Sequence, residues 1–76
     1  MQLDTDKIDD ATLALLYLTL HGGFRAWKGH DWNVLDRLHE RDLIENPASK
    51  AKSVMFTEEG LQRAKELFEA MFVKPA

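Results

Sequence analysis

The stretch from Leu43 to Phe72 constrains the fold of this chain more than any other part. It begins with the short apolar segment Leu43-Ile44-Glu45 and resumes, after a polar loop, with Val54-Met55-Phe56. Two such segments around a loop that contains Pro and Ser predict an antiparallel β-hairpin. We therefore expect residues 43–45 to pair with residues 54–56, with Lys50 and Lys52 in the loop between them.

The same stretch ends in a predicted helix. Thr57 can cap its N-terminus, and Glu58 and Glu59 suit the positive end of the helix dipole. Gly60 costs up to about 1 kcal/mol relative to Ala inside a helix, so we expect the backbone of another segment, such as a strand, to pass close to it. Apolar residues at spacings of three and four predict the face that packs on the core: Leu61, Ala64, Leu67, Phe68, Met71 and Phe72.

A first helix is predicted to open at Asp4-Thr5-Asp6, where Asp4 or Asp6 can cap it, and to carry apolar residues from Ile8 to Leu20. Its apolar positions are too many for one side of a surface helix, so the helix is either central in the fold or shared between the core and a second chain. His21-Gly22-Gly23 ends it, because Gly tolerates the left-handed conformation at a helix C-terminus. His21 itself is favourably placed for the helix dipole.

The middle of the chain predicts a brief strand and a second helix. Phe24 and Ala26 alternate with Arg25, as in an extended segment. Trp27 either covers the core or lies in a binding surface, and its large apolar area favours burial. Asp31 can cap a helix from Trp32 to Arg41, whose inner face carries Val34, Leu35 and Leu38.

Two segments of the chain resemble the winged-helix transcription regulators: Leu35-Asp36-Arg37-Leu38-His39-Glu40-Arg41-Asp42-Leu43-Ile44 and Val54-Met55-Phe56-Thr57-Glu58-Glu59-Gly60. In those families a helix ends in Leu, a few polar residues and Gly-Leu-Ile, and a basic wing leads to Leu-Thr-x-x-Gly at the start of the next helix. Leu43-Ile44 and Thr57 to Gly60 match this pattern, whereas Asp42 replaces the usual Gly. The match covers about half of the chain, and the whole sequence also resembles a group of small bacterial proteins of unknown function.

The resemblance implies an α+β, mainly helical fold: one compact winged-helix-like domain over residues 1–76, with three helices and a C-terminal β-hairpin wing. A full winged helix has a further helix before its recognition helix. Only residues 21–30, which include three Gly, are available for it here, so the helix-turn-helix is expected to be shortened or lost. In the resemblance, Trp32 to Arg41 is the recognition helix, and Lys50 and Lys52 lie on the wing.

Composition narrows the function. The chain has 76 residues and no Cys, so neither a disulfide nor a thiolate metal site stabilises the fold, and a partner subunit is the remaining way to bury more surface. The net charge of −3 weighs against a dedicated nucleic-acid binder. The apolar run from Leu13 to Leu18 is too short for a membrane span, and the N-terminus lacks the features of a signal peptide. We expect a cytoplasmic protein with no membrane partner.

Catalysis and cofactors are not expected. His21, His30 and His39 are nine residues apart, a spacing that matches no zinc pattern. No Gly-rich phosphate loop is present, and no Ser lies in a nucleophile context. The acidic residues near the N-terminus lack the loop Gly and distal Glu of an EF-hand, so they are interpreted as capping and solvated groups.

Two kinds of binding protein remain. The favoured one is a non-catalytic, dimerising protein-interaction module that keeps a winged-helix-like frame and binds an unknown protein partner. Its homodimer interface would use the surplus apolar residues of the first or last helix: Leu13, Leu16, Leu20, Leu67, Phe68, Met71 and Phe72.

The alternative is a small winged-helix DNA-binding transcriptional regulator. Its nucleic-acid contacts would be Asn33, Arg37, Arg41, Lys50 and Lys52. It ranks second because Asp36 and Glu40, on the same helix face as the arginines, would be repelled by duplex phosphates.

Overall fold

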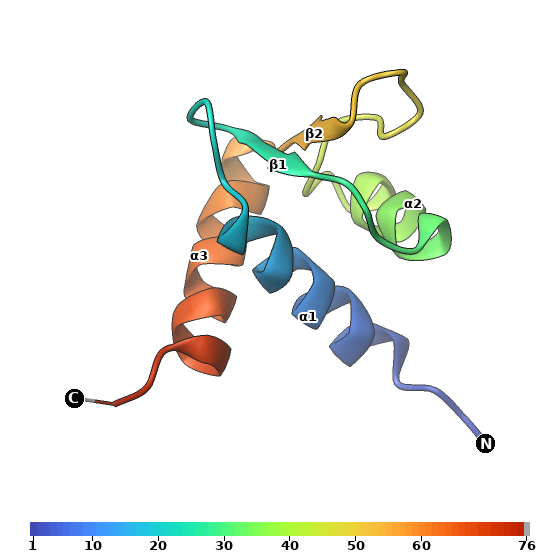
Figure 1. Cartoon of the computed structure of the whole chain (residues 1–76). Coiled ribbons are helices and arrows are strands. Elements are labelled where there is room, and N and C mark those ends of the chain that lie inside the picture. The colour runs from blue at the N-terminus through green and yellow to red at the C-terminus, as the bar shows by residue number, and fades with distance from the viewer. Residues whose placement is uncertain (76) are drawn as a thin grey trace.

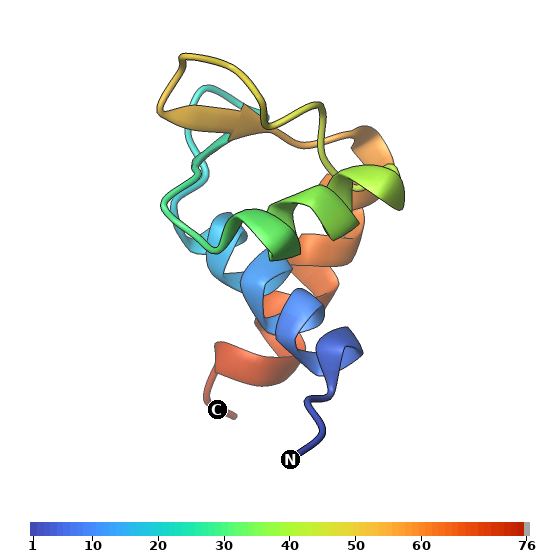
Figure 2. The same ribbon diagram turned by 90° about the vertical axis from the view of Figure 1, so that its right-hand side faces the viewer.

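Three helices and two short strands alternate along the chain. The computed structural model describes residues 1–75 and shows an α+β, mainly helical fold. The elements are α1 (Thr5–Leu18), β1 (Arg25–Trp27), α2 (Trp32–Glu40), β2 (Ser53–Met55) and α3 (Glu58–Phe72) (Figure 1). The two-stranded sheet lies at one end of the molecule and both termini lie at the other, as Figure 2 also shows.

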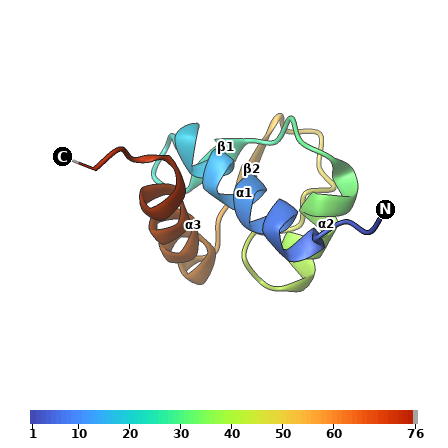
Figure 3. The same ribbon diagram turned by 90° about the horizontal axis from the view of Figure 1, so that it is seen from below.

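Helix α1 is the central element. It lies between α3 and α2 in the view from below (Figure 3), and Leu13, Ala14 and Leu16 are fully buried against its neighbours. The helix is therefore central in the fold, which was one of the two predicted explanations of its apolar sequence. The side chain of Asp4 accepts a hydrogen bond from the Lys7 N–H and caps the helix as predicted.

The chain turns sharply after α1. Helix α1 ends at Leu18, two residues before the predicted end, and a tight reversal joins His21 to Arg25 through two backbone hydrogen bonds of 2.8 and 3.0 Å. Gly22 and Gly23 adopt φ values of +58° and +85°, a region that residues with a Cβ rarely adopt. The reversal leads directly into β1, so that residues 19–31 hold a strand and no helix. A further helix before residue 32 was expected to be shortened or lost, and residues 21–30 contain none.

The sheet differs from the predicted hairpin. Strand β2 pairs antiparallel with β1, in the register Arg25↔Met55, Ala26↔Val54 and Trp27↔Ser53, and not with a strand at residues 43–45. The predicted partner makes a single bridge, Ile44↔Phe56, together with a 2.8 Å hydrogen bond from the Glu45 N–H to the Met55 carbonyl. The chain then leaves the sheet at Asn46-Pro47, because Pro has no N–H to continue the ladder.

The turn after α2 is hydrogen-bonded to the start of α3. Asp42 adopts φ +58°, and the N–H groups of Asp42 and Leu43 bond back to the carbonyls of His39 and Leu38 in the Schellman pattern. The Thr57 hydroxyl donates to the Asp42 carbonyl and accepts from the Gly60 N–H, capping α3 as predicted.

Gly60 lies at the closest approach within this turn. A Cβ at Gly60 would overlap the Leu43 carbonyl oxygen and lie 2.9 Å from its Cα. This confirms the predicted close backbone approach and explains why the chain accepts Gly near the start of α3.

The hydrophobic core gathers between the helices and the inner face of the sheet. Asp31 caps α2, whose predicted inner face is buried. Helix α3 buries only Gly60 and Ala64, and Met71 and Phe72 in its last turn are exposed. The buried apolar core consists of Leu13, Leu16, Ala26, Val34, Leu35, Leu38, Leu43, Ile44, Val54, Phe56 and Ala64.

Candidate functional site

The outer face of α2 is tied to α1 by an ion pair. The Arg37 guanidinium donates to both carboxylate oxygens of Asp9, with its Nε 2.8 Å from Oδ2 and its Nη2 2.7 Å from Oδ1. Asp9 is 2% exposed, whereas the Arg37 side chain is 35% exposed. The hydrogen bonds to Asp9 raise the pKa of Arg37, so this guanidinium stays charged at every accessible pH.

This pairing changes the role of Arg37. The sequence placed Arg37 among the nucleic-acid contacts and Asp9 among the solvated groups at the start of α1. The structure joins them in a bidentate contact, the strongest geometry for an Arg–carboxylate pair. Arg37 is thereby held on α1 and its charge is balanced by Asp9.

The other predicted nucleic-acid contacts are open to solvent. Asn33 and Arg41 are exposed on α2, and Lys50 and Lys52 are exposed on the loop between Ile44 and β2. Arg41 lies at the C-terminal end of α2, and the two lysines lie near the sheet. The structure therefore distributes these cations over two regions of the surface.

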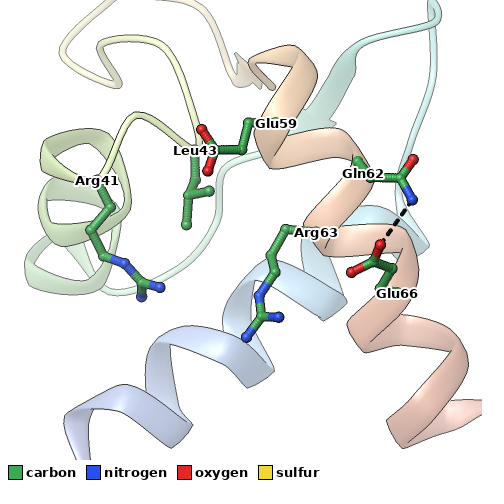
Figure 4. Close-up of a pocket in the computed structure, with 6 residues that line it drawn as sticks. All are labelled: Arg41, Leu43, Glu59, Gln62, Arg63 and Glu66. Carbon is green, nitrogen blue, oxygen red and sulfur yellow. Dashed lines mark hydrogen bonds between the residues drawn. The ribbon is translucent and has the colours of Figure 1, made fainter.

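A groove of about 430 Å³ separates the end of α2 from α3 (Figure 4). Arg41 and Arg63 enter it from the two helices, and Leu43 lies between them. Glu59 and Glu66 also line the groove, and Arg63 lies 3.8 Å from the Asp10 carboxylate of α1. Because the charges of both signs are mixed, the groove offers no net attraction to an anion or a cation.

The residues of the predicted dimer interface fall into two groups. Leu13 and Leu16 are fully buried in the core of the chain itself, so their assignment to an interface was wrong: the face of α1 that carries them packs inside the domain. Leu20, Leu67 and Phe68 are partly buried, and Met71 and Phe72 are 46% and 45% exposed.

An apolar strip connects the exposed members of this set. Tyr17, Leu20, Phe24 and Leu61 line a second groove, of about 370 Å³, between α1 and α3. Tyr17 packs on Phe68 with ring centroids 5.2 Å apart, and Phe68 packs on Phe72 at 6.0 Å. These ring contacts therefore continue the apolar surface from the groove along α3 to its C-terminal turn. We call this surface the aromatic strip, defined by Tyr17, Leu20, Phe24, Leu61, Phe68 and Phe72.

Two exposed tryptophans lie near the sheet. Burial was favoured for Trp27, but the residue is 54% exposed, and Trp32 has the same value. The prediction was wrong because Ala26 takes the inward position of the three-residue strand, so the alternation of β1 turns Trp27 outward. The sequence contained this signal in the predicted alternation of Ala26 with its neighbours.

The comparisons with known proteins identify a family. The model of a domain of unknown function, DUF6429, matches residues 4–74. The chain belongs to this family. It is also similar to the uncharacterized protein y4hR of Sinorhizobium fredii (strain NBRC 101917 / NGR234), with 58% identity over 74 residues, which cover 97% of this chain and 100% of that protein. No solved structure matches the chain significantly.

Family membership confirms the resemblance to small bacterial proteins of unknown function. For this DUF6429 member, none of the helices within residues 1–75 has the length and hydropathy needed to cross a membrane. In the same residues, no three side chains of His, Cys, Asp or Glu are grouped so that they could hold a metal ion.

Proposed function

We propose that the chain is a non-catalytic, homodimerising protein-interaction module built on a winged-helix-like frame. The observation that carries the proposal is the aromatic strip, which continues from the groove between α1 and α3 to exposed Phe72. A small domain buries a limited share of its apolar surface, and contiguous exposed apolar surface on a soluble protein commonly marks an interaction site.

A second copy of the chain fits the strip. A two-fold interface uses the same surface on both copies, so it needs a surface that complements itself. Apolar side chains meet this condition, and the rim of the groove carries both Glu58 and Lys65. These opposite charges can face each other across a two-fold axis.

The order of helices and strands along the chain supports the winged-helix-like part of the proposal. The Ile44↔Phe56 bridge brings residues 43–45 beside the end of β2, where a wing strand would lie, and the Thr57 hydroxyl connects the turn at Asp42 with Gly60, residues that belong to the two resembling segments. The frame lacks a helix between α1 and α2 in the described residues. We therefore infer a winged-helix-like domain whose duplex-reading half is reduced.

The alternative function, a duplex-DNA-binding regulator, receives less support. Exposed Arg41, Lys50 and Lys52 favour it. Arg37, however, is held by Asp9, and the exposed carboxylates of Asp36 and Glu40 lie on the same helix. Phosphate contacts supply most of the non-specific affinity for DNA, and these carboxylates oppose them.

The dimer is tested by light scattering on the Phe72→Glu variant. We expect the unmodified chain at high micromolar concentration to have twice its 8.7 kDa mass, and Phe72→Glu to be monomeric, because a carboxylate would be desolvated in the interface. Leu18→Glu is the matched control: it places the same charge on an exposed apolar position of α1 outside the strip, so its mass should remain that of the dimer.

Two results would contradict the proposal. One is a mass of 8.7 kDa for the unmodified chain across the concentration range. The other is a dimer that persists in Phe72→Glu but dissociates in Leu18→Glu, which would move the interface away from the aromatic strip. Circular dichroism of each variant establishes that it is folded.

A further inference from the structure

Positive and negative side chains are distributed unevenly between the strands with their adjoining loops and the rest of the molecule. Residues 25–32 and 46–57 contain four Lys or Arg and one Asp, a net charge of +3. The other 56 residues contain six Lys or Arg and twelve Asp or Glu, a net charge of −6. The first group forms the two strands, the linker into α2 and the loop before β2, which we call the sheet end (Figures 1 and 2). The sheet end is thus a basic region on an acidic protein.

The cations of the sheet end are not neutralised by ion pairs. The Arg25 Nε donates to the Ser53 hydroxyl at 2.8 Å, and the Lys28 ammonium donates to the carbonyls of Pro47 and Ser49, both at 2.8 Å. These acceptors carry no charge. Lys50 and Lys52 are exposed, and among the described residues none of the four cations forms an ion pair with a carboxylate. Their positive charge is therefore available to a ligand.

The sheet end also exposes both tryptophans. Trp27 stacks on His21 with ring centroids 4.4 Å apart, and the Lys28 ammonium lies 5.7 Å from the centroid of the Trp32 ring. Each indole is thus supported by a neighbour, yet about half of each residue remains open to solvent. Lys28 additionally holds the loop of residues 46–52 against the linker, which keeps the lysines of the loop near the indoles.

We propose that the sheet end binds single-stranded nucleic acid. Bases would stack on Trp27 and Trp32, and phosphates would contact Arg25, Lys28, Lys50 and Lys52. Proteins that bind single strands combine these two elements, a positively charged path for the backbone and aromatic side chains for the bases. The proposal goes beyond the dimer, because it uses the basic sheet end, which is a surface outside the aromatic strip.

A single strand fits this surface better than the other polyanions. A duplex hides the faces of its bases inside the stack, so exposed indoles would have no base to stack on. An acidic protein would need only the cations and would leave both indoles without a role. The combination of unneutralised cations and accessible ring faces therefore favours unpaired bases.

The test is a titration of the full chain with oligo(dT) and oligo(U) of about 12 nucleotides, a length within the range of known single-strand sites. Stacking should quench the intrinsic tryptophan fluorescence in a saturable manner. Four phosphate contacts on a single strand predict a slope of about −2.8 for log affinity against log salt concentration. Trp27→Ala should weaken binding roughly 5- to 150-fold, and Trp27→Phe, which keeps an aromatic face, should retain most of the affinity.

Charge variants separate the sheet end from the rest of the protein. Lys50→Gln with Lys52→Gln should reduce the magnitude of the salt slope by about 1.4. Lys7→Gln with Lys74→Gln makes the same change of net charge on α1 and the C-terminal segment, and should leave the slope unchanged.

Heparin, polyglutamate and a duplex of equal length serve as competing probes. The absence of saturable quenching by either oligonucleotide would refute the proposal. Equal affinity for heparin with no effect of Trp27→Ala would reduce the surface to a general polyanion site. Tighter binding of polyglutamate would favour an acidic protein partner, and tighter binding of the duplex would favour the regulator. Each of these outcomes overturns single-strand binding.

Discussion

The sheet end and the helical body use their charged side chains in different ways. In the body, formed by α1, α2 and α3, Arg37 is held by Asp9, and Arg63 lies 3.8 Å from the Asp10 carboxylate. At the sheet end, Arg25 and Lys28 donate to a hydroxyl and to carbonyl groups, so their charge is kept. The net charge of −3 is the sum of a positive sheet end and a negative body, so it describes neither region. A basic surface can lie on an acidic chain when the carboxylates are concentrated elsewhere.

The two regions also differ in how they are held together. The apolar core lies mainly within the body and reaches the sheet region through Ala26, Val54 and Phe56, whereas the sheet of the described residues has only three residue pairs and two further bridges. The turn in which Gly60 meets Leu43 connects them, because it fixes α3 to the segment that leads into the loop. Variants that break this connection should have the largest effect on stability.

The Gly60→Ala substitution should disrupt the contact between the start of α3 and the turn at Leu43. Its methyl group would overlap the Leu43 carbonyl, and overpacking of this kind costs about 1–3 kcal/mol, only partly offset by the better helix propensity of Ala. We expect a loss of about 2 kcal/mol in unfolding free energy, and a melting temperature lower by about 10 °C. Gly29→Ala is the control, because nothing lies within 4 Å of a Cβ there. It should change stability by no more than about 0.5 kcal/mol. Equal stability of the two variants in urea denaturation would contradict the described turn.

The Asp9→Asn substitution tests whether an ion pair neutralises Arg37 in the body. It removes the carboxylate that holds Arg37 and leaves a buried polar group beside an unbalanced guanidinium. We expect a clear loss of stability, smaller than that of Gly60→Ala because Arg37 can turn into solvent. Asp10→Asn, which alters the longer and more exposed contact with Arg63, should have a much smaller effect. The same denaturation series measures both, and a larger loss for Asp10→Asn would reverse the assignment.

His30 provides the smallest expected effect, at the sheet end. Partial burial lowers the pKa of His30, because it disfavours the charged imidazolium. The unfolded chain therefore takes up a proton first as the pH falls below about 6.5, and the folded state loses stability over this range. His30→Asn should flatten this part of the stability profile between neutral pH and about pH 5. An unchanged profile would assign the pH dependence to other groups.

Features that depend on neighbours in the sequence could be predicted. The caps Asp4, Asp31 and Thr57 follow from local backbone chemistry, and a Gly near the start of a helix indicated the close approach at Gly60. The partner of β2 could not be predicted in this way. Residues 43–45 and 25–27 are both short and apolar enough to pair with it, and proximity in sequence favoured the first. Pro47 allows only one bridge there, so the longer pairing forms with β1.

The residues of the candidate sites show the same division between features that neighbours in the sequence indicate and features that depend on tertiary structure. Arg37 and Asp9 are 28 positions apart, and no local pattern indicates that α2 crosses α1 where they meet. Burial of Leu13 and Leu16 likewise depends on where α3 and α2 lie, whereas Phe72 is exposed in the last turn of α3. The sequence therefore indicated which types of side chain are in surplus, and the tertiary structure decided which of them are accessible.

Amide NMR spectra of one sample, first diluted and then titrated with oligo(dT), test the separation of the two surfaces most directly. We predict that dilution shifts resonances of the aromatic strip, at Tyr17, Leu20, Phe24, Leu61, Phe68 and Phe72, and leaves the sheet end unchanged. Oligo(dT) should then shift residues 25–32 and 50–53 and leave the strip unchanged. Dilution shifts at the sheet end, oligonucleotide shifts on α3, or no response to either treatment would contradict the account.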